Sequence, residues 1–480
     1  MGDSELCYLS AEEALGLFKE RKLSPVELME AVIRRAEAVE PKINAFTATH
    51  FERALSQAKK AEDRYLRPSA RTRALEGLPI VVKDEQAIAG ERTTQGSLLY
   101  RDHVDAADHP IVERIKRAGG IIHARGATPE FCCSTFCWSR LWGVTRNPWN
   151  LEYSPGGSSG GSAASLAAGS TPLATGSDIG GSIRIPASAC GVVGFKPPYG
   201  RNPDVPPFNL DWYNHVGPLA RNVADCARLQ NVMAGPHPGD VATLRPKLRI
   251  PAKLGDVRGW RIAYSLNLDF FEVDAEVRAN TLAVLDAFRE LGATTEEIEL
   301  GWGEEIREAA WSHYAAIFGP IVQEAAEKYP DQLSDYSLVF AERTARAASA
   351  SRGLHSTLET EARMYASLGP LLEKYRLLVC PTLAVPSVAA DHDVRDESFS
   401  INGVPVDPYV DWCLTYPFNM LSRCPVLSVP SGQASSGVPT GVQLVGRTFD
   451  DVSVFRAGAA LEGLRPRFDV PESRPSFRRS

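Results

Sequence analysis

The sequence of residues 155–186 is PGGSSGGSAASLAAGSTPLATGSDIGGSIRIP. Two segments rich in glycine and serine lie at its ends, and the pattern between them predicts a helix over 162–168 and a strand that begins at Leu173. Glycine permits positive φ angles and a close approach of the backbone, so these segments can expose serine hydroxyls and turn several N–H groups toward one point. A nucleophilic serine beside an oxyanion site requires both.

The alternation of helix and strand continues on both sides of this stretch. Short apolar runs predict strands at residues 78–82, 120–122, 173–174, 261–264, 377–381 and 426–430. Helical patterns are found at residues 111–118, 162–168, 277–291 and through most of 304–375. Strands and helices in alternation are typical of α/β architecture. Near the N-terminus, the spacing of Ser10 with Glu13 and of Ser24 with Glu27 is that of capping boxes and predicts the starts of two helices.

Composition excludes several classes of protein. Hydrophobic residues make up 44% and charged residues 23% of the 480, as in an ordinary globular chain. The 59 acidic residues outnumber the 52 basic ones, and no Lys/Arg block could follow a phosphate backbone, so we expect no nucleic-acid partner. No run approaches the ~18 apolar residues of a spanning helix, and the N-terminus lacks a signal-peptide pattern. We therefore expect a cytoplasmic protein with no membrane partner and, from nine scattered cysteines, reduced thiols.

Three other interpretations of the glycine-rich segments fit less well. A flexible linker would not alternate with AASLAA and IRIP. A phosphate-binding loop would contain G-x-x-x-x-G-K-[ST] or G-x-G-x-x-G, and neither is present. Residues 156–160 match the G-x-S-x-G elbow of α/β-hydrolases, but residues 153–155 are a poor strand to precede that turn.

A serine nucleophile needs a base, and Lys83 is a better candidate than any histidine. The nine histidines lack ligand spacing. Cys132, Cys133 and Cys137 do not have a zinc spacing either, so we assign them to buried packing beside a pocket and expect no metal. Lys83 ends the apolar run 78–82, and burial can lower the pKa of an amine by ~3 to 5 units, which would leave it neutral. A strand-end lysine that reaches to water is the alternative.

Several motifs in order along the chain resemble those of the amidase signature family of hydrolases. They are GLPIVVKD at 77–84, WGVTRNPW at 142–149, PGGSSGGSAA at 155–164, GSDIGGSIRIPA at 176–187, GFKP at 194–197 and GVQLVG at 441–446. The resemblance covers residues 5–465 and is strongest over 75–225.

This resemblance implies a single large α/β/α domain over residues 1–480, with a central mixed β-sheet flanked by helices. Its expected parts are N-terminal helices (1–65), a catalytic core (66–235), a variable helical region (265–375) and a C-terminal return to the core (376–465).

The resemblance also implies a Ser-cisSer-Lys triad. Ser182 would be the nucleophile, Ser158 the bridging serine and Lys83 the base, with a cis peptide between Gly157 and Ser158. The triad would form an acyl-enzyme on Ser182 and needs no cofactor.

The loop before Ser182 would bind the oxyanion through backbone N–H groups, those of Ile179, Gly180, Gly181 and Ser182. Losing one such donor typically costs ~100 to 1,000-fold in rate. Asp178 and Arg184 flank this loop, and we expect them to brace it through buried hydrogen bonds.

The segments that diverge within the family are rich in aromatic residues here: Phe131, Phe136, Trp138, Phe208, Trp212, Tyr213, Trp311, Tyr314 and Phe318. They favour an apolar or aryl amide as a small-molecule substrate. The alternatives are a carbamate (urethane) or ester hydrolase on the same scaffold, the glutaminase subunit of a tRNA-dependent amidotransferase, and a non-catalytic binding protein. A homodimer is left open.

Overall fold

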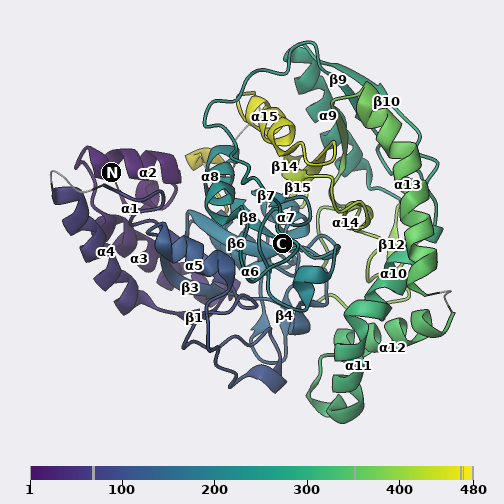
Figure 1. The fold of residues 1–480 in the computed structure, drawn as a ribbon, viewed down its shortest axis with the longest axis horizontal. Coiled ribbons are helices and arrows are strands. Elements are labelled where there is room, and N and C mark those ends of the chain that lie inside the picture. The colour runs from purple at the N-terminus through teal and green to yellow at the C-terminus, as the bar shows by residue number, and fades with distance from the viewer. Residues whose placement is uncertain (1, 68–70, 351–352, 465–467, 469, 478–480) are drawn as a thin grey trace.

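The computed structural model describes residues 2–67, 71–350, 353–464, 468 and 470–477. Within these residues, an eleven-stranded mixed β-sheet runs through the molecule (Figure 1). Its strands, in spatial order, are β1 (Phe46–Thr49), β3 (Ile121–Gly126), β2 (Pro79–Lys83), β6 (Leu173–Ser177), β8 (Val216–Ala220), β7 (Val193–Lys196), β14 (Val426–Gln433), β15 (Pro439–Gly446), β11 (Leu377–Pro381), β9 (Arg261–Tyr264) and β10 (Thr294–Glu297). Two small hairpins pair β4 (Trp138–Ser139) with β5 (Gly143–Val144) and β12 (Ser400–Ile401) with β13 (Val404–Pro405).

The pairing of the strands confirms the predicted mixed sheet. Strand β2 is parallel to β3 and β6, and β9 is parallel to β10 and β11. The other pairs in the large sheet are antiparallel. All six predicted strands are present, although β1, β7, β8, β10 and β15 were not identified from the sequence. Two of these carry glycine or proline inside a short run, VGFK in β7 and VGPLA in β8, which obscures the strand pattern.

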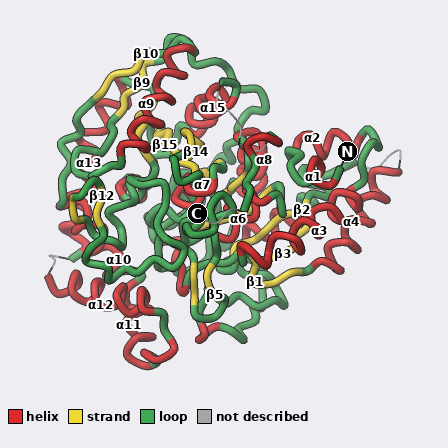
Figure 2. The backbone as a smooth tube through the Cα atoms, turned by 180° about the vertical axis from the view of Figure 1, so that it is seen from behind, coloured by secondary structure: helices red, strands yellow, loops and turns green. Residues whose placement is uncertain are grey.

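Helices cover both faces of the sheet. They are α1 (Asp3–Leu6), α2 (Ala11–Lys19), α3 (Pro25–Ile43), α4 (Phe51–Leu66), α5 (Pro110–Arg117), α6 (Gly160–Ala168), α7 (Arg184–Cys190), α8 (Val223–Met233), α9 (Ala275–Glu290), α10 (Glu305–Ile317), α11 (Gly319–Lys328), α12 (Asp335–Ala350), α13 (Leu354–Lys374), α14 (Pro417–Met420) and α15 (Asp451–Glu462). Helices α1–α4 lie at one end of the molecule and α10–α13 at the other, in both views (Figures 1 and 2). No helix in the described ranges is long and apolar enough to cross a membrane.

Both predicted capping boxes begin helices. Ser10 accepts a hydrogen bond from the backbone of Glu13 at the start of α2, and Ser24 does the same for Glu27 at the start of α3. Helix α4 begins after His50, whose side chain makes no capping hydrogen bond. The sequence therefore held no start signal for α4.

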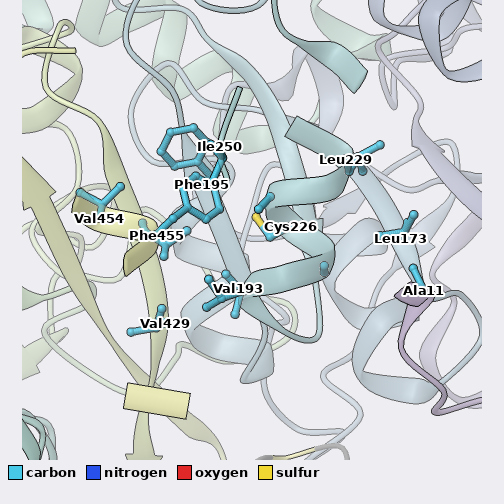
Figure 3. Close-up of a cluster of buried hydrophobic side chains, with 14 of the residues drawn as sticks. Ala11, Leu173, Val193, Phe195, Cys226, Leu229, Ile250, Val429, Val454 and Phe455 are labelled. Carbon is cyan, nitrogen blue, oxygen red and sulfur yellow. The ribbon is translucent and has the colours of Figure 1, made fainter. Parts of the chain in front are cut away.

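The side chains of β2 alternate between two hydrophobic clusters, one on each face of the sheet. Ile80 and Val82 belong to a cluster that also includes residues of α5, α8 and α15, part of which is drawn in Figure 3. Val81 belongs to a cluster on the other face with residues of α6 and α7. Because side chains on a strand point to alternate faces, Lys83 lies on the same face as Val81. The fold thus directs Lys83 toward α6 and α7.

Candidate active site

Lys83 lies at the end of β2 with its side chain fully buried. Its Nζ donates hydrogen bonds to the Oγ of Ser158 at 2.7 Å and to the Oγ of Ser177 at 2.6 Å. The same Nζ forms an ion pair with Oε2 of Glu85 at 3.0 Å. The amine is therefore shielded from water, and the alternative of a lysine that reaches to solvent is wrong.

Ser158 lies one residue before the N-terminal cap of α6, and a cis peptide bond joins it to Gly157. A Cβ atom on Gly157 would lie 2.2 Å from the carbonyl oxygen of Phe136, so only glycine fits there. The backbone of Phe136 thus packs directly against the segment that carries the Ser158 hydroxyl.

Ser182 lies two residues before α7, and its side chain lines a cavity together with that of Ser158. The backbone carbonyl of Ser182 accepts a hydrogen bond from the N–H of Ser159 at 3.1 Å, which joins the two glycine-rich loops. No hydrogen bond between the side chains of Ser158 and Ser182 is present in the described residues. Lys83 and Ser158 are therefore in contact, and Ser182 lines the same cavity as Ser158.

Four successive backbone N–H groups, those of residues 179–182, donate no hydrogen bond to any atom of the described chain. The carbonyls in this loop are bound from the opposite side. The Tyr314 hydroxyl donates to the carbonyl of Ile179 at 3.4 Å, and the Thr415 hydroxyl donates to that of Gly180 at 2.6 Å. A trans peptide places N–H and C=O on opposite sides, so these two anchors turn the N–H groups of Gly180 and Gly181 away from Tyr314 and Thr415. Such free, fixed donors can bind an anion.

Gly181 can only be glycine. Its φ is +132°, and a Cβ atom would lie 2.0 Å from Oγ1 of Thr415. Thr415 lies close to Gly181 because its hydroxyl donates a hydrogen bond to the carbonyl of the preceding residue, Gly180.

Asp178 and Arg184 form a fully buried ion pair that closes the loop on itself. Arg184 Nη2 lies 2.9 Å from Asp178 Oδ1, and Arg184 Nε lies 3.0 Å from Oδ2. Asp178 Oδ2 also accepts the backbone N–H of Ile183 at 3.2 Å. Burial acts to raise the pKa of Asp178. The charge and hydrogen bonds of the Arg184 guanidinium outweigh this effect, so the pKa lies well below its ordinary value. The carboxylate therefore stays ionised and holds both ends of the loop.

Glu85 was not identified from the sequence, although it lies only two residues after Lys83. Its Oε2 accepts a hydrogen bond from Ser177 Oγ at 2.5 Å as well as facing Lys83. We expected burial to leave Lys83 with a lowered pKa, but the net shift of the pKa is upward. Burial does act to lower it, but the negative charges of Cys132, when ionised, and of Glu85 raise the pKa of Lys83 above its ordinary value.

Two cavities meet at Ser182. The first, of about 100 Å³, has the carboxylates of Glu85 and Asp204 in its lining, and we call it the acidic cavity. The second, of about 60 Å³, we call the aromatic cavity, because its lining includes Trp311, Tyr314, Phe318, Phe340, Tyr409 and Tyr416. Among the described residues, neither lining includes a lysine or an arginine.

The aromatic residues singled out from the sequence divide into two groups. Those that line a cavity at Ser182 are Phe131, Phe208, Trp311, Tyr314 and Phe318, and those that do not are Phe136, Trp138, Trp212 and Tyr213. Tyr213, for example, is fully buried, stacks on His313 at 3.5 Å and donates a hydrogen bond to Glu361. Three further rings were missed: Phe340 lies in the helical stretch after Glu304 but was not singled out, and Tyr409 and Tyr416 lie outside the segments considered.

The cysteines and histidines have the structural roles expected of them. All nine cysteines are free thiols, and Cys132 lines both cavities at Ser182. Burial raises the pKa of the Cys132 thiol to about 12, so it is not ionised at neutral pH. Both ring nitrogens of the buried His123 are bonded to backbone carbonyls. His109 lines the acidic cavity and was not singled out.

Comparison with known proteins identifies the family of this chain. The model of the family described as Amidase matches residues 27–455. The chain belongs to the amidase signature family. This amidase is 35% identical to an acylamidase of Rhodococcus erythropolis, with 98% of each chain covered. It is 36% identical to a glutamyl-tRNA(Gln) amidotransferase subunit of Anaeromyxobacter sp. (strain K), over 95% of this chain and 96% of that one.

A solved structure of a bacterial aryl acylamidase of the same family matches this amidase with a TM-score of 0.87 and 29% identity, covering 95% of this chain and 96% of that chain. The family and these relatives show that the protein is an enzyme that hydrolyses amides.

Proposed function

We propose that this amidase hydrolyses apolar or aryl amides through an acyl-enzyme on Ser182, with Ser158 and Lys83 as a proton relay. The observation that carries the proposal is the 2.7 Å hydrogen bond between Lys83 and Ser158, in a site where Ser182 lines the same cavity. The free N–H groups of residues 179–182 lie in the same loop as the nucleophile.

The relay moves protons in a closed cycle. Neutral Lys83 takes the proton of the Ser158 hydroxyl while Ser158 takes that of Ser182, and the Ser182 oxygen attacks the amide carbonyl. The oxyanion is bound by the backbone N–H groups of the loop. As the C–N bond breaks, Lys83 returns its proton through Ser158 to the leaving nitrogen. Water then attacks the acyl-enzyme and gives a proton to the same relay, and the relay returns this proton to the Ser182 oxygen as the carboxylic acid leaves.

The cavity linings support an apolar substrate over glutamine. A glutaminase subunit must bind the α-carboxylate of an amino acid, for which a cationic side chain is the usual partner. Neither cavity lining, in the described part of the chain, includes arginine or lysine, and the aromatic cavity offers six rings instead. Aromatic walls favour an apolar or aryl group.

A substrate panel tests the proposal. Amides, carbamates and esters that share one acyl group would be compared by kcat/KM, and intact-protein mass spectrometry would detect the acyl adduct. We expect turnover of the amide and an adduct on Ser182 that disappears in Ser182→Ala. A carbamate or ester turned over faster than the amide would replace the amide as the preferred substrate. Glutamine hydrolysis faster than that of the apolar amide would contradict the proposed substrate class.

A further inference from the structure

Ser182 lies where the acidic and aromatic cavities join. The two linings share only Cys132, Ile179, Ser182 and Phe318 among the described residues. An amide has two substituents, one on the carbonyl carbon and one on the nitrogen. When the carbonyl carbon is at Ser182, the two substituents extend from it in different directions. The two cavities offer two such directions with different chemistry.

The proton relay is on one side only. Ser158 lines the acidic cavity and not the aromatic one, and so do its neighbours Ser177 and Glu85. Gly180 lines the aromatic cavity and not the acidic one. The site therefore has an acid–base side and an opposite side.

The chemistry then fixes the orientation of the substrate. The leaving nitrogen must receive a proton from the relay, so it has to lie within hydrogen-bond reach of the Ser158 hydroxyl. We infer that the amine portion of the substrate occupies the acidic cavity and that its acyl portion occupies the aromatic cavity. This inference rests on the proposed function, because only an acyl-transfer reaction gives the substrate these two sides.

The aromatic cavity suits an aromatic or compact apolar acyl group. Its rings contact one another edge-on or tilted, with centroids 5.5 Å apart for Trp311 and Tyr409 and 5.3 Å apart for Phe318 and Phe340. These rings are fixed by packing before any ligand enters, so little ordering cost remains. A further ring inserted among them gains offset or edge contacts.

The acidic cavity suits an amine with a positively charged or hydrogen-bond-donating substituent. Oε2 of Glu85 is bound by Ser177 and Lys83, whereas Oε1 accepts no hydrogen bond from the described residues. Asp204 is held in place by His109 at 2.8 Å and by Asn214 at 2.8 Å. When Lys83 is neutral and ready to act as the base, two carboxylates face the cavity, and its lining in the described residues contains no lysine or arginine. A carboxylate on the amine portion would be repelled.

Two isomeric amides test the orientation, because they differ only in the direction of the amide bond. N-methylphenylacetamide, the amide of phenylacetic acid with methylamine, carries its ring on the acyl side. N-benzylacetamide, the amide of acetic acid with benzylamine, carries it on the amine side. We expect kcat/KM to be about tenfold or more higher for N-methylphenylacetamide. The opposite preference would overturn the inference.

Two matched substitutions locate the effect. Val410 lines only the aromatic cavity and Val205 only the acidic one. Val410→Phe should lower kcat/KM for N-methylphenylacetamide about tenfold and change that for N-benzylacetamide little, and Val205→Phe should do the reverse. If the two variants exchange these effects, the inference is wrong while the proposed function stands. If no amide is hydrolysed and no adduct forms on Ser182, both are wrong.

The charge of the acidic cavity is tested with phenylacetyl amides of ethylenediamine and of β-alanine. We expect about tenfold faster turnover, as kcat/KM, of the cationic ethylenediamine amide at low salt. The preference should weaken in Asp204→Asn and at high salt. Asp204 also bonds to His109 and Asn214, so Asp204→Asn changes the structure of the cavity as well as its charge. The salt dependence of the wild-type enzyme tests the charge alone. Equal rates for the two amides at low salt would contradict the proposed amine class.

Discussion

The Oε2 atom of Glu85 lies 3.0 Å from the Nζ of Lys83. In the proposed relay, this contact bears directly on how activity depends on pH. A neutral Lys83 is required for the first proton transfer of the proposed mechanism, whereas the Glu85 carboxylate favours the charged ammonium and acts to raise the pKa of Lys83 against the lowering effect of burial. The carboxylate also strengthens Lys83 as a proton acceptor once the reaction has begun. Glu85 therefore decreases the fraction of enzyme with a neutral Lys83 near neutral pH, and it increases the basicity of Lys83.

Glu85→Gln tests the effect of the Glu85 charge on Lys83. The amide keeps an oxygen that can accept from Ser177 but removes the negative charge. The pKa of Lys83 should fall, so the acid limb of the kcat/KM profile should move to lower pH by about one unit. The maximal rate on the alkaline plateau should also fall, because the base is weaker. An unchanged acid limb would show that Glu85 does not control Lys83.

Lys83→Ala should abolish turnover, because Ser158 then has no base. Lys83→Arg should not restore it, since guanidinium stays protonated and cannot accept a proton. Thermal melting of both variants would check that the fold is retained. Measurable hydrolysis by either variant would contradict the assignment of Lys83 as the base.

Thr415→Val should lower kcat about tenfold with little change in KM, because the Gly180 carbonyl loses its 2.6 Å anchor and the oxyanion donors lose their fixed direction. Tyr314→Phe removes the longer 3.4 Å anchor of the Ile179 carbonyl and should have a smaller effect on kcat. Steady-state kinetics on one amide distinguishes the two. A change confined to KM would indicate that Thr415 acts on substrate binding instead.

Lys196 makes the stability of the fold depend on pH. It is fully buried, its Nζ donates to the carbonyl of Cys424 at 3.0 Å, and burial lowers its pKa to about 7. In the unfolded chain the ordinary pKa is ~10.4. Between these values the unfolded state binds the extra proton, so the free energy of unfolding should rise with pH from about 7 upward.

Urea unfolding at several pH values measures this rise, and Lys196→Met is the control. The slope of the unfolding free energy against pH should be smaller in the variant than in the wild type. Equal slopes in the two proteins would contradict the assignment of the effect to Lys196.

The parts of the site that the sequence predicted are local in the chain. Ser158 and Ser182 lie in glycine-rich loops that each precede a helix, and Lys83 ends an apolar strand. Composition and spacing pointed to these two loops and to Lys83, whereas the choice of Ser158 and Ser182 within the loops came from the resemblance to the family. Glu85 was missed because nothing in the sequence shows that its side chain folds back against Lys83.

Residues far apart in the chain could not be placed from the sequence. Tyr314 and Thr415 are more than 100 residues from the loop that they anchor, and both contacts depend on how the helical region packs against the sheet. The rings of Phe340, Tyr409 and Tyr416 reach the aromatic cavity for the same reason. Hydrophobic pattern predicts which residues are buried but not which distant ones meet.

The two residues that anchor the proposed oxyanion loop come late in the order of synthesis. Lys83, Ser158 and Ser182 have all been synthesised before Tyr314 and Thr415 leave the ribosome. Until those later residues dock, the loop has no hold on its carbonyls and its N–H groups have no set direction. In the proposed mechanism, a nascent chain therefore contains all three residues of the triad before the oxyanion donors gain their fixed direction, and full activity depends on Thr415, which lies 235 residues after Gly180.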